Sequence, residues 1–327
     1  MEAGFSARLV EAWAVAQRGI FDASPSSFFP ASVAELFHGL ATNSICVDKL
    51  QHVLAAQAED AWNAADKVGK DKTEVARNLA NAIRGASALF SASPTSACHI
   101  MPSASYEFYL KARTGTFRLP ELMCVCGECS LSLQHIFSCK KLRGRFIRHD
   151  VIVALLADMF RAAGMVARSE VRVVRGTQMR MDVVVYTANA VYWIDVSIVN
   201  PMARSYLTTA DCIGLREKSK RRKWSAHAEA TGVQFMPFCL NVFGGLGPAA
   251  LSLLQMVASK AFINYPYAAA ASPGKWMAAH RAESAQRVTA AIAHISCVSV
   301  EEAVVVAQGL QPKSIYRGVR KFARVEN

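Results

Sequence analysis

The chain has 327 residues, of which 52% are hydrophobic and 19% are charged. This length suffices for one large core or two modest domains, and the apolar share excludes a disordered tail. Lysine and arginine number 37 against 25 acidic residues, and the resulting charge of +12 favours a polyanionic partner such as a nucleic acid.

The first part of the chain is predicted to be helical. Residues 1–95 are rich in alanine and repeat apolar residues at helical spacing. The N-terminus carries two acids and no unbroken apolar core, so we expect no signal peptide. Because the nine cysteines do not form a regular disulfide framework, an intracellular location, in the nucleus or the cytoplasm, is predicted. The Ser- and Pro-containing segment 91–96 is the first predicted domain boundary.

Residues 96–145 hold a Cys/His cluster, and a helix is predicted over 147–163. Three runs rich in β-formers follow at 171–174, 181–186 and 191–199. The short link between the last two predicts a hairpin, with Asn189 tolerating a left-handed turn.

A helix over 216–230 is predicted next, followed by the uncharged stretch 231–259. Two prolines and a glycine-rich break favour a buried strand and a buried helix over a membrane span in that stretch. The order α-β-β-β-α-β-α predicts an α+β or α/β core over 146–265, a mixed sheet flanked by helices. Residues 266–327 are predicted to be alanine-rich helices with a basic tail.

The Cys/His cluster predicts a structural zinc site. Its members lie within sixteen residues: Cys124, Cys126, Cys129, His135 and Cys139. Zinc requires four nitrogen or sulfur donors in a tetrahedron. One set consists of Cys126 and Cys129 with His135 and Cys139. In the competing set, Cys124 replaces Cys129. Either set has three cysteines and one histidine and leaves no open coordination position.

Two aspartates interrupt apolar strands and need a partner. Asp182 and Asp195 lie in the second and third predicted strands, where an ionised carboxylate is costly unless it is paired or holds a metal. With the carbonyl of Val196 they form a minimal oxygen shell for Mg²⁺ or Mn²⁺, and Glu170 would add a carboxylate at the sheet margin. The alternative for Asp182 is a salt bridge with Arg180.

A lysine-dense helix follows the second aspartate. The segment 216–223 has six basic residues against one acidic residue, and residues 140–180 have ten against three. A lysine beside a metal would orient the attacking water or balance charge. The candidates are Lys218, Lys220 and Lys223, and for each of them a solvated helix face is the alternative.

At this point the residues resemble a known family: the C-terminal restriction-like endonuclease region of site-specific non-LTR retrotransposons. The resemblance covers roughly residues 85–265. It rests on a Cys-Cys-His-Cys knuckle, a helix start, two strand motifs and a basic helix, together with a similar helix at 106–115 before the knuckle. The matching residues are Cys126-Gly through His135-Ile-Phe-Ser-Cys139, Arg148-His149-Asp150, Arg180-Met-Asp182, Ile194-Asp195-Val196-Ser197 and Lys220-Arg-Arg-Lys223-Trp224.

The resemblance implies a nuclease fold of the PD-(D/E)XK type. The second motif of that type normally ends in lysine, but Ser197 stands here. In this retroelement family the lysine comes from the following helix, which makes Lys220 the first candidate and Lys218 the second. Met181 replaces the usual proline and Trp224 replaces tyrosine, which removes a hydroxyl. The reverse-transcriptase motif Tyr/Phe-x-Asp-Asp is absent, so the chain resembles a detached piece of a longer protein or a stand-alone descendant.

The leading hypothesis is a metal-dependent DNA endonuclease that nicks one strand of a target duplex. In the family this nick primes reverse transcription of element RNA, so element RNA and a reverse transcriptase domain are possible partners. Residues expected to hold DNA, largely through phosphates, are Arg143, Arg145, Arg148, Arg180 and Lys223. The alternative is a zinc-containing nucleic-acid-binding protein whose nuclease core has decayed. A third hypothesis treats residues 1–95 as a helical interaction module.

Overall fold

The computed structural model describes residues 72–83, 86, 88, 102–174, 178–207, 209, 211–264 and 272–311. The chain divides into two compact units, Met1–Asp71 and Lys72–Asn327. The first unit, and with it most of the predicted helical region 1–95, lies outside the described residues. The basic tail beyond residue 311 also lies outside them.

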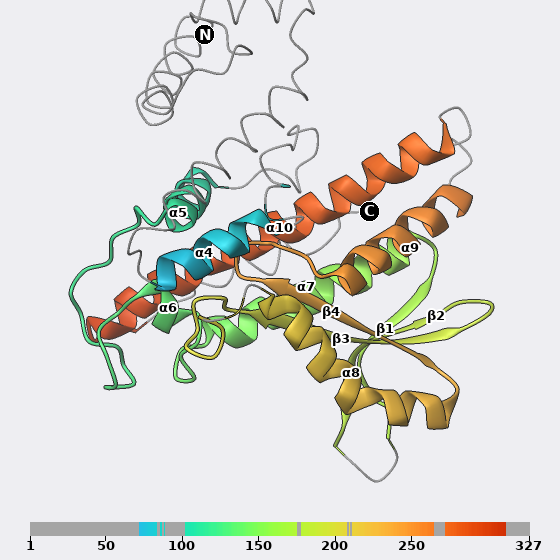
Figure 1. Ribbon diagram of the computed structural model, residues 1–327, viewed down its shortest axis with the longest axis horizontal. Coiled ribbons are helices and arrows are strands. Elements are labelled where there is room, and N and C mark those ends of the chain that lie inside the picture. Colours follow the sequence, from blue (N-terminus) through green and yellow to red (C-terminus); the bar gives the residue numbers. More distant parts are fainter. Residues whose placement is uncertain are drawn as a thin grey trace, which may run out of the picture. The chain divides into compact units, whose positions relative to one another are not determined.

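The second unit alternates helices with one four-stranded sheet (Figure 1). Its elements are α4 (Lys72–Ala82), α5 (Ser103–Thr114), α6 (Leu133–Ile136), α7 (Gly144–Ala162), β1 (Val166–Arg172), β2 (Arg180–Tyr186), β3 (Val191–Val199), α8 (Cys212–Thr231), β4 (Gln234–Asn241), α9 (Pro248–Asn264) and α10 (Pro273–Ala307). From α7 to α9 the order is the predicted α-β-β-β-α-β-α, and the mixed sheet with flanking helices is confirmed.

The sheet follows chain order, β1-β2-β3-β4. The first three strands are antiparallel, whereas β4 runs parallel to β3 after the crossover through α8. The β2–β3 turn is closed by Thr187, whose hydroxyl donates to the carbonyl of Ala190 at 2.9 Å and accepts from its amide at 3.1 Å. Asn189 does not adopt the left-handed conformation, because the Thr187 side chain closes the turn without it.

Helices cover both faces of this sheet, giving three layers. Apolar side chains of α7, α9 and α10 form the main core with one face, including Val183, Ile194 and Phe238. On the other face α8 packs Trp224 against Trp193, with ring centroids 6.4 Å apart. In Figure 1, α8 lies on the opposite side of the strands from α9 and α10.

Two helices outside the predicted core range 146–265 also pack with the sheet. α4 packs with the second unit: the side chain of Asn241 donates to the carbonyl of Ala80 at 3.0 Å, so residues from Lys72 on join the sheet domain. α10, part of the predicted tail region, is a 35-residue helix that contributes Val288, Ile292 and other residues to the main core. Its length and composition would allow it to cross a membrane, but 67% of its most apolar window is buried, as in a core helix.

The first strand lies earlier in the chain than predicted. The apolar run at 171–174 suggested a strand there, but β1 extends over Val166–Arg172 and buries only Ala167. As an edge strand it exposes most of its side chains, so its sequence lacks the alternation that marks a half-buried strand.

Candidate active site and metal centre

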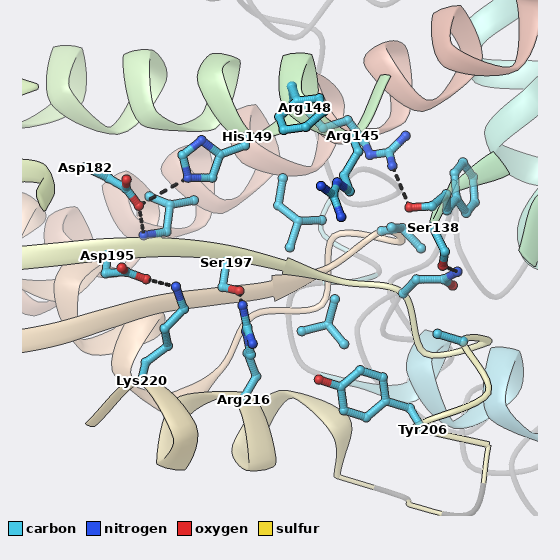
Figure 2. Close-up of a pocket in the computed structure, with 18 residues that line it drawn as sticks. Ser138, Arg145, Arg148, His149, Asp182, Asp195, Ser197, Tyr206, Arg216 and Lys220 are labelled. Atoms are coloured by element: carbon cyan, nitrogen blue, oxygen red, sulfur yellow. Dashed lines mark hydrogen bonds and ion pairs between the residues drawn. The ribbon is translucent and has the colours of Figure 1, made fainter. Parts of the chain in front are cut away.

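A pocket of about 550 Å³ opens where α7, the end of β3 and α8 meet. Figure 2 shows side chains entering it from both flanking helices and from the sheet between them. Its polar lining includes Arg145, His149, Asp182, Asp195, Ser197, Arg216 and Lys220. The two predicted aspartates and the first-choice lysine therefore line one cavity.

Asp182 lies where β2 separates from β3. The paired register ends at Val183 opposite Ile194, and one further step would place Asp182 opposite Asp195. Instead, the Asp182 carboxylate accepts a hydrogen bond from the backbone amide of Val196 at 2.6 Å. The Val196 amide is thus bonded to the Asp182 side chain instead of to the backbone of β2. The paired part of β2 and β3 therefore ends next to the pocket.

Asp195 is buried on the other side of β3, with 5% of the residue exposed. Its Oδ1 accepts from the indole N–H of Trp224 at 3.1 Å, and its Oδ2 forms an ion pair with the ammonium of Lys220. The Trp224 side chain thus supplies a hydrogen-bond donor to this buried carboxylate. Lys220 reaches the strand from α8, as proposed for a lysine that is missing from position 197 (Figure 2).

Ser197, two residues after Asp195 on β3, is hydrogen-bonded by an arginine of α8. The Nε atom of Arg216 donates to the Ser197 hydroxyl at 2.7 Å. Arg216 lies one helical turn before Lys220 on α8, so both cations point to the same side of β3. No role was predicted for Arg216 from the sequence; its i, i+4 spacing from Lys220 was the available signal.

His149, within the Arg148-His149-Asp150 motif, is a further site residue for which the sequence predicted no role. Its Nε2 lies 3.2 Å from Asp182 Oδ2, and its Nδ1 lies 3.4 Å from Asp150 Oδ1. Burial disfavours the charged imidazolium, but the hydrogen bond and negative charge of Asp182 outweigh it and raise the pKa of His149. Asp182 is thus contacted from α7, whereas Asp195 is contacted from α8.

The other predicted catalytic residues lie away from the pocket lining. Lys218 is exposed on α8. Glu170 is exposed on the edge strand, between the paired residues Ser169 and Val171, with a φ of 56°. The register places Glu170 opposite Asp182, but its carboxylate is not part of the cavity lining.

The predicted DNA-binding arginines divide into two groups. Arg143, Arg145 and Arg180 are exposed, as is Lys223, whose ammonium lies 4.5 Å from the centre of the Trp224 ring. Arg148 is only 1% exposed; it donates to the carbonyl of Phe137 at 2.9 Å and stacks on the Phe137 ring. This burial argues against a phosphate contact, and Arg148 instead joins α7 to the Cys/His segment.

The Cys/His cluster is brought together. Donor atoms of Cys124, Cys126, His135 and Cys139 all lie within 4.8 Å of one another. The sulfurs of Cys124 and Cys139 are 3.8 Å apart, and Cys126 Sγ lies 3.3 Å from His135 Nε2. A zinc tetrahedron with bonds near 2.3 Å to sulfur and 2.0 Å to nitrogen has edges of about 3.5–3.8 Å, so these donors fit the ion.

The structure selects the competing ligand set. Cys129, a member of the first set, lies outside the group, and Cys124 takes its place. A hairpin turn explains this choice: the amide of Cys124 donates to the carbonyl of Cys129 at 2.9 Å, and Gly127 adopts a left-handed φ of 76°. The amide of Glu128 then donates to Cys126 Sγ and lowers the pKa of that thiol, as suits a thiolate ligand.

The aspartate pair differs from this cluster. Among the described residues, the Cys/His group is the only set of three or more His, Cys, Asp or Glu donors close enough to share an ion. Asp182, Asp195 and His149 do not form a second set. Asp195 Oδ2 is buried, and the Lys220 ammonium is its partner among the described residues. A divalent cation at this oxygen would have to share it with the ammonium.

Comparison with models of protein families found none that matches this chain, and no curated protein matches it. The residues of the site and their contacts are therefore the basis for a function.

Proposed function

We propose that this chain is a metal-dependent DNA endonuclease that nicks one strand of a duplex. The observation that carries the proposal is the Lys220–Asp195 ion pair beside Asp182 in one pocket. Two carboxylates and a lysine are the groups that metal-assisted phosphodiester hydrolysis uses. Lys220 comes from α8, so it can take the role of the lysine that the nuclease motif has where this chain has Ser197.

The carboxylates of Asp182 and Asp195 and the carbonyl of Val196 would hold the catalytic cation. When bound, Mg²⁺ or Mn²⁺ supplies charge that screens the phosphate and acidifies water. Lys220 balances Asp195 and orients the attacking water. Arg216 and Arg145 line the same cavity and attract the phosphates on either side of the cleaved bond.

The proposed zinc knuckle has a structural role here. Its four donors leave no open position for substrate. It holds the chain just before α7, where Arg143 and Arg145 are exposed to a nucleic acid. The family resemblance supports a DNA target and a link to reverse transcription of element RNA.

The test is nicking of supercoiled DNA with Mg²⁺ or Mn²⁺. We expect Asp195→Ala and Lys220→Ala to lose about 100-fold or more in rate, the usual range for groups that move protons or hold the metal. Lys218→Ala is the matched control, because it removes an exposed lysine from the same helix. Equal rates for the wild type and Asp195→Ala would refute the assignment.

The decayed-nuclease alternative predicts salt-dependent DNA binding without cleavage. Calorimetric titration with Mn²⁺ separates the two hypotheses, because only an active centre requires ion binding that is lost in Asp182→Ala. An unchanged Mn²⁺ isotherm in that variant would favour the alternative.

A further inference from the structure

An exposed phenylalanine at the rim of the pocket has no role in the chemistry proposed above. Phe146 lies in the first turn of α7, is 55% exposed and lines the pocket. It is the most exposed aromatic residue among those the structure describes. Large exposed aromatics beside a charged cavity are typical of binding surfaces.

Phe146 is arranged as half of a stacking surface. The Arg145 guanidinium carbon lies 4.8 Å from the centre of its ring, so a cation covers part of the aromatic face. Flat pairs of this kind accept nucleobases, which stack on aromatic rings and on guanidinium planes. The surrounding charge fits a polyanion: the first turn of α7 has no acidic residue, and Lys140, Lys141 and Arg143 precede it.

The position of Phe146 relative to the site defines what it would contact. Phe146 and His149 are three residues apart on α7, hence neighbours on one helix face with Cβ atoms about 5–6 Å apart. His149 contacts Asp182. A base on Phe146 would therefore lie within one or two nucleotides of the phosphate at Asp182, because successive nucleotides rise about 3.4 Å along a strand.

The N-terminal end of α7 is held in place by close packing against α10. A Cβ atom at Gly144 would lie 2.3 Å from Ser299 Oγ on α10, so the two helices approach more closely than any other residue allows. The carbonyl of Phe137 holds Arg148 one turn further on. Exposure of an aromatic ring to water is unfavourable, so a ring fixed in an exposed position indicates a binding role. A rigid aromatic surface is well suited to stack a nucleobase that has left the duplex.

We infer that Phe146 and Arg145 form a platform that stacks one unpaired nucleobase next to the cleaved phosphodiester. The preferred substrate is then a duplex with an unpaired nucleotide at the nick site, such as a bubble or a junction, rather than a fully paired duplex. This inference rests on the proposed nuclease function for its substrate class, but the platform binds DNA independently of cleavage.

The test measures binding without added Mg²⁺ or Mn²⁺ and without chelator, so that cleavage plays no part and the zinc site stays intact. The full chain is titrated into two oligonucleotide duplexes carrying 2-aminopurine, one fully paired and one with the 2-aminopurine in a three-nucleotide bubble. We expect tighter binding to the bubble and quenching of its fluorescence. Phe146→Ala should weaken bubble binding by about tenfold to 100-fold and leave paired-duplex binding unchanged. Phe146→Trp should retain the preference.

Two controls keep the inference falsifiable. Ile263→Ala removes a side chain that is 71% exposed and lies outside this pocket, and it should change neither affinity. Phe146→Leu keeps an apolar side chain without a ring and should behave like Phe146→Ala. Equal affinity of the wild type for both duplexes, or full bubble binding by Phe146→Leu, would overturn the platform. A loss of nicking in Asp195→Ala with the bubble preference intact would support both assignments separately.

Discussion

The choice between Cys124 and Cys129 is the most direct test of the structure, because the two cysteines are alternatives for one coordination position. Cys124 is 3% exposed and its sulfur lies 3.8 Å from Cys139, whereas Cys129 lies outside the group of donors. We therefore compare Cys124→Ser with Cys129→Ser, two substitutions of identical chemistry five residues apart.

The expected loss of zinc affinity can be estimated from the number of ligands. Structural zinc binds with about 10–16 kcal/mol, so one of four ligands accounts for about 2.5–4 kcal/mol, or roughly 70- to 900-fold in affinity. Cys124→Ser should weaken zinc binding by this amount. Cys129→Ser should change it by less than about threefold, since its thiol is not a ligand. Burial raises the pKa of the Cys124 thiol to about 12, so its thiolate requires the charge of the ion.

Zinc affinity is measured by competition with a chromophoric chelator, and cobalt substitution reports the number of thiolates through its charge-transfer band. Thermal unfolding with and without chelator adds a second reading, because Cys124 and Cys139 belong to a core cluster with Phe108 of α5 and Val300 of α10. Loss of zinc in Cys129→Ser with retention in Cys124→Ser would refute the hairpin geometry and restore the set with Cys129.

Three further predictions concern the packing around the site. Gly144→Ala should lower the free energy of unfolding by about 1–3 kcal/mol, measured by urea denaturation, because the new methyl group would overlap Ser299; no loss would mean that α7 and α10 are further apart. Trp224→Phe should cost about 1.5–3 kcal/mol by the same assay, since it removes the donor to the buried Asp195 carboxylate, and a neutral result would argue against that bond. Burial lowers the pKa of His294 below its ordinary 6.5, so the unfolded state binds the proton more readily. The stabilisation is then complete above pH 6.5 and is lost as pH falls towards the lowered pKa, and His294→Gln should flatten the pH dependence of the melting temperature between pH 7 and 5.

The strands and their order were predictable because their signals are local. The run Val191–Val199 matches β3 in full, since a central strand buried on both faces is apolar throughout. Asp195 stood out within it for the same reason: a carboxylate in such a run is costly. The family resemblance predicted that the lysine would come from the helix after β3, with Lys220 as the first candidate and Lys218 as the second. In the structure the Lys220 ammonium forms an ion pair with the Asp195 carboxylate.

The remaining features depend on contacts that no short window of sequence contains. The place of Cys124 in the donor group is set by a hairpin that turns at Gly127, whereas the spacing of either set in the sequence was compatible with zinc. The burial of Arg148 depends on the carbonyl of Phe137, eleven residues earlier. An arginine in a basic segment suggests a phosphate contact until its partner is known.

A second buried side chain, Asn200 at the end of β3, also connects the Cys/His cluster with the acidic pocket. Its Nδ2 donates to the carbonyl of Gln134 at 2.9 Å and to the hydroxyl of Ser138 at 2.8 Å, on the segment that supplies His135 and Cys139. The strand that carries Asp195 thus positions the knuckle, and the chain leaving the knuckle begins α7 with Arg145 and Phe146. A metal bound by this cluster would therefore order the first turn of α7 against the strand that carries Asp195, and this links the proposed zinc site to the proposed nuclease centre.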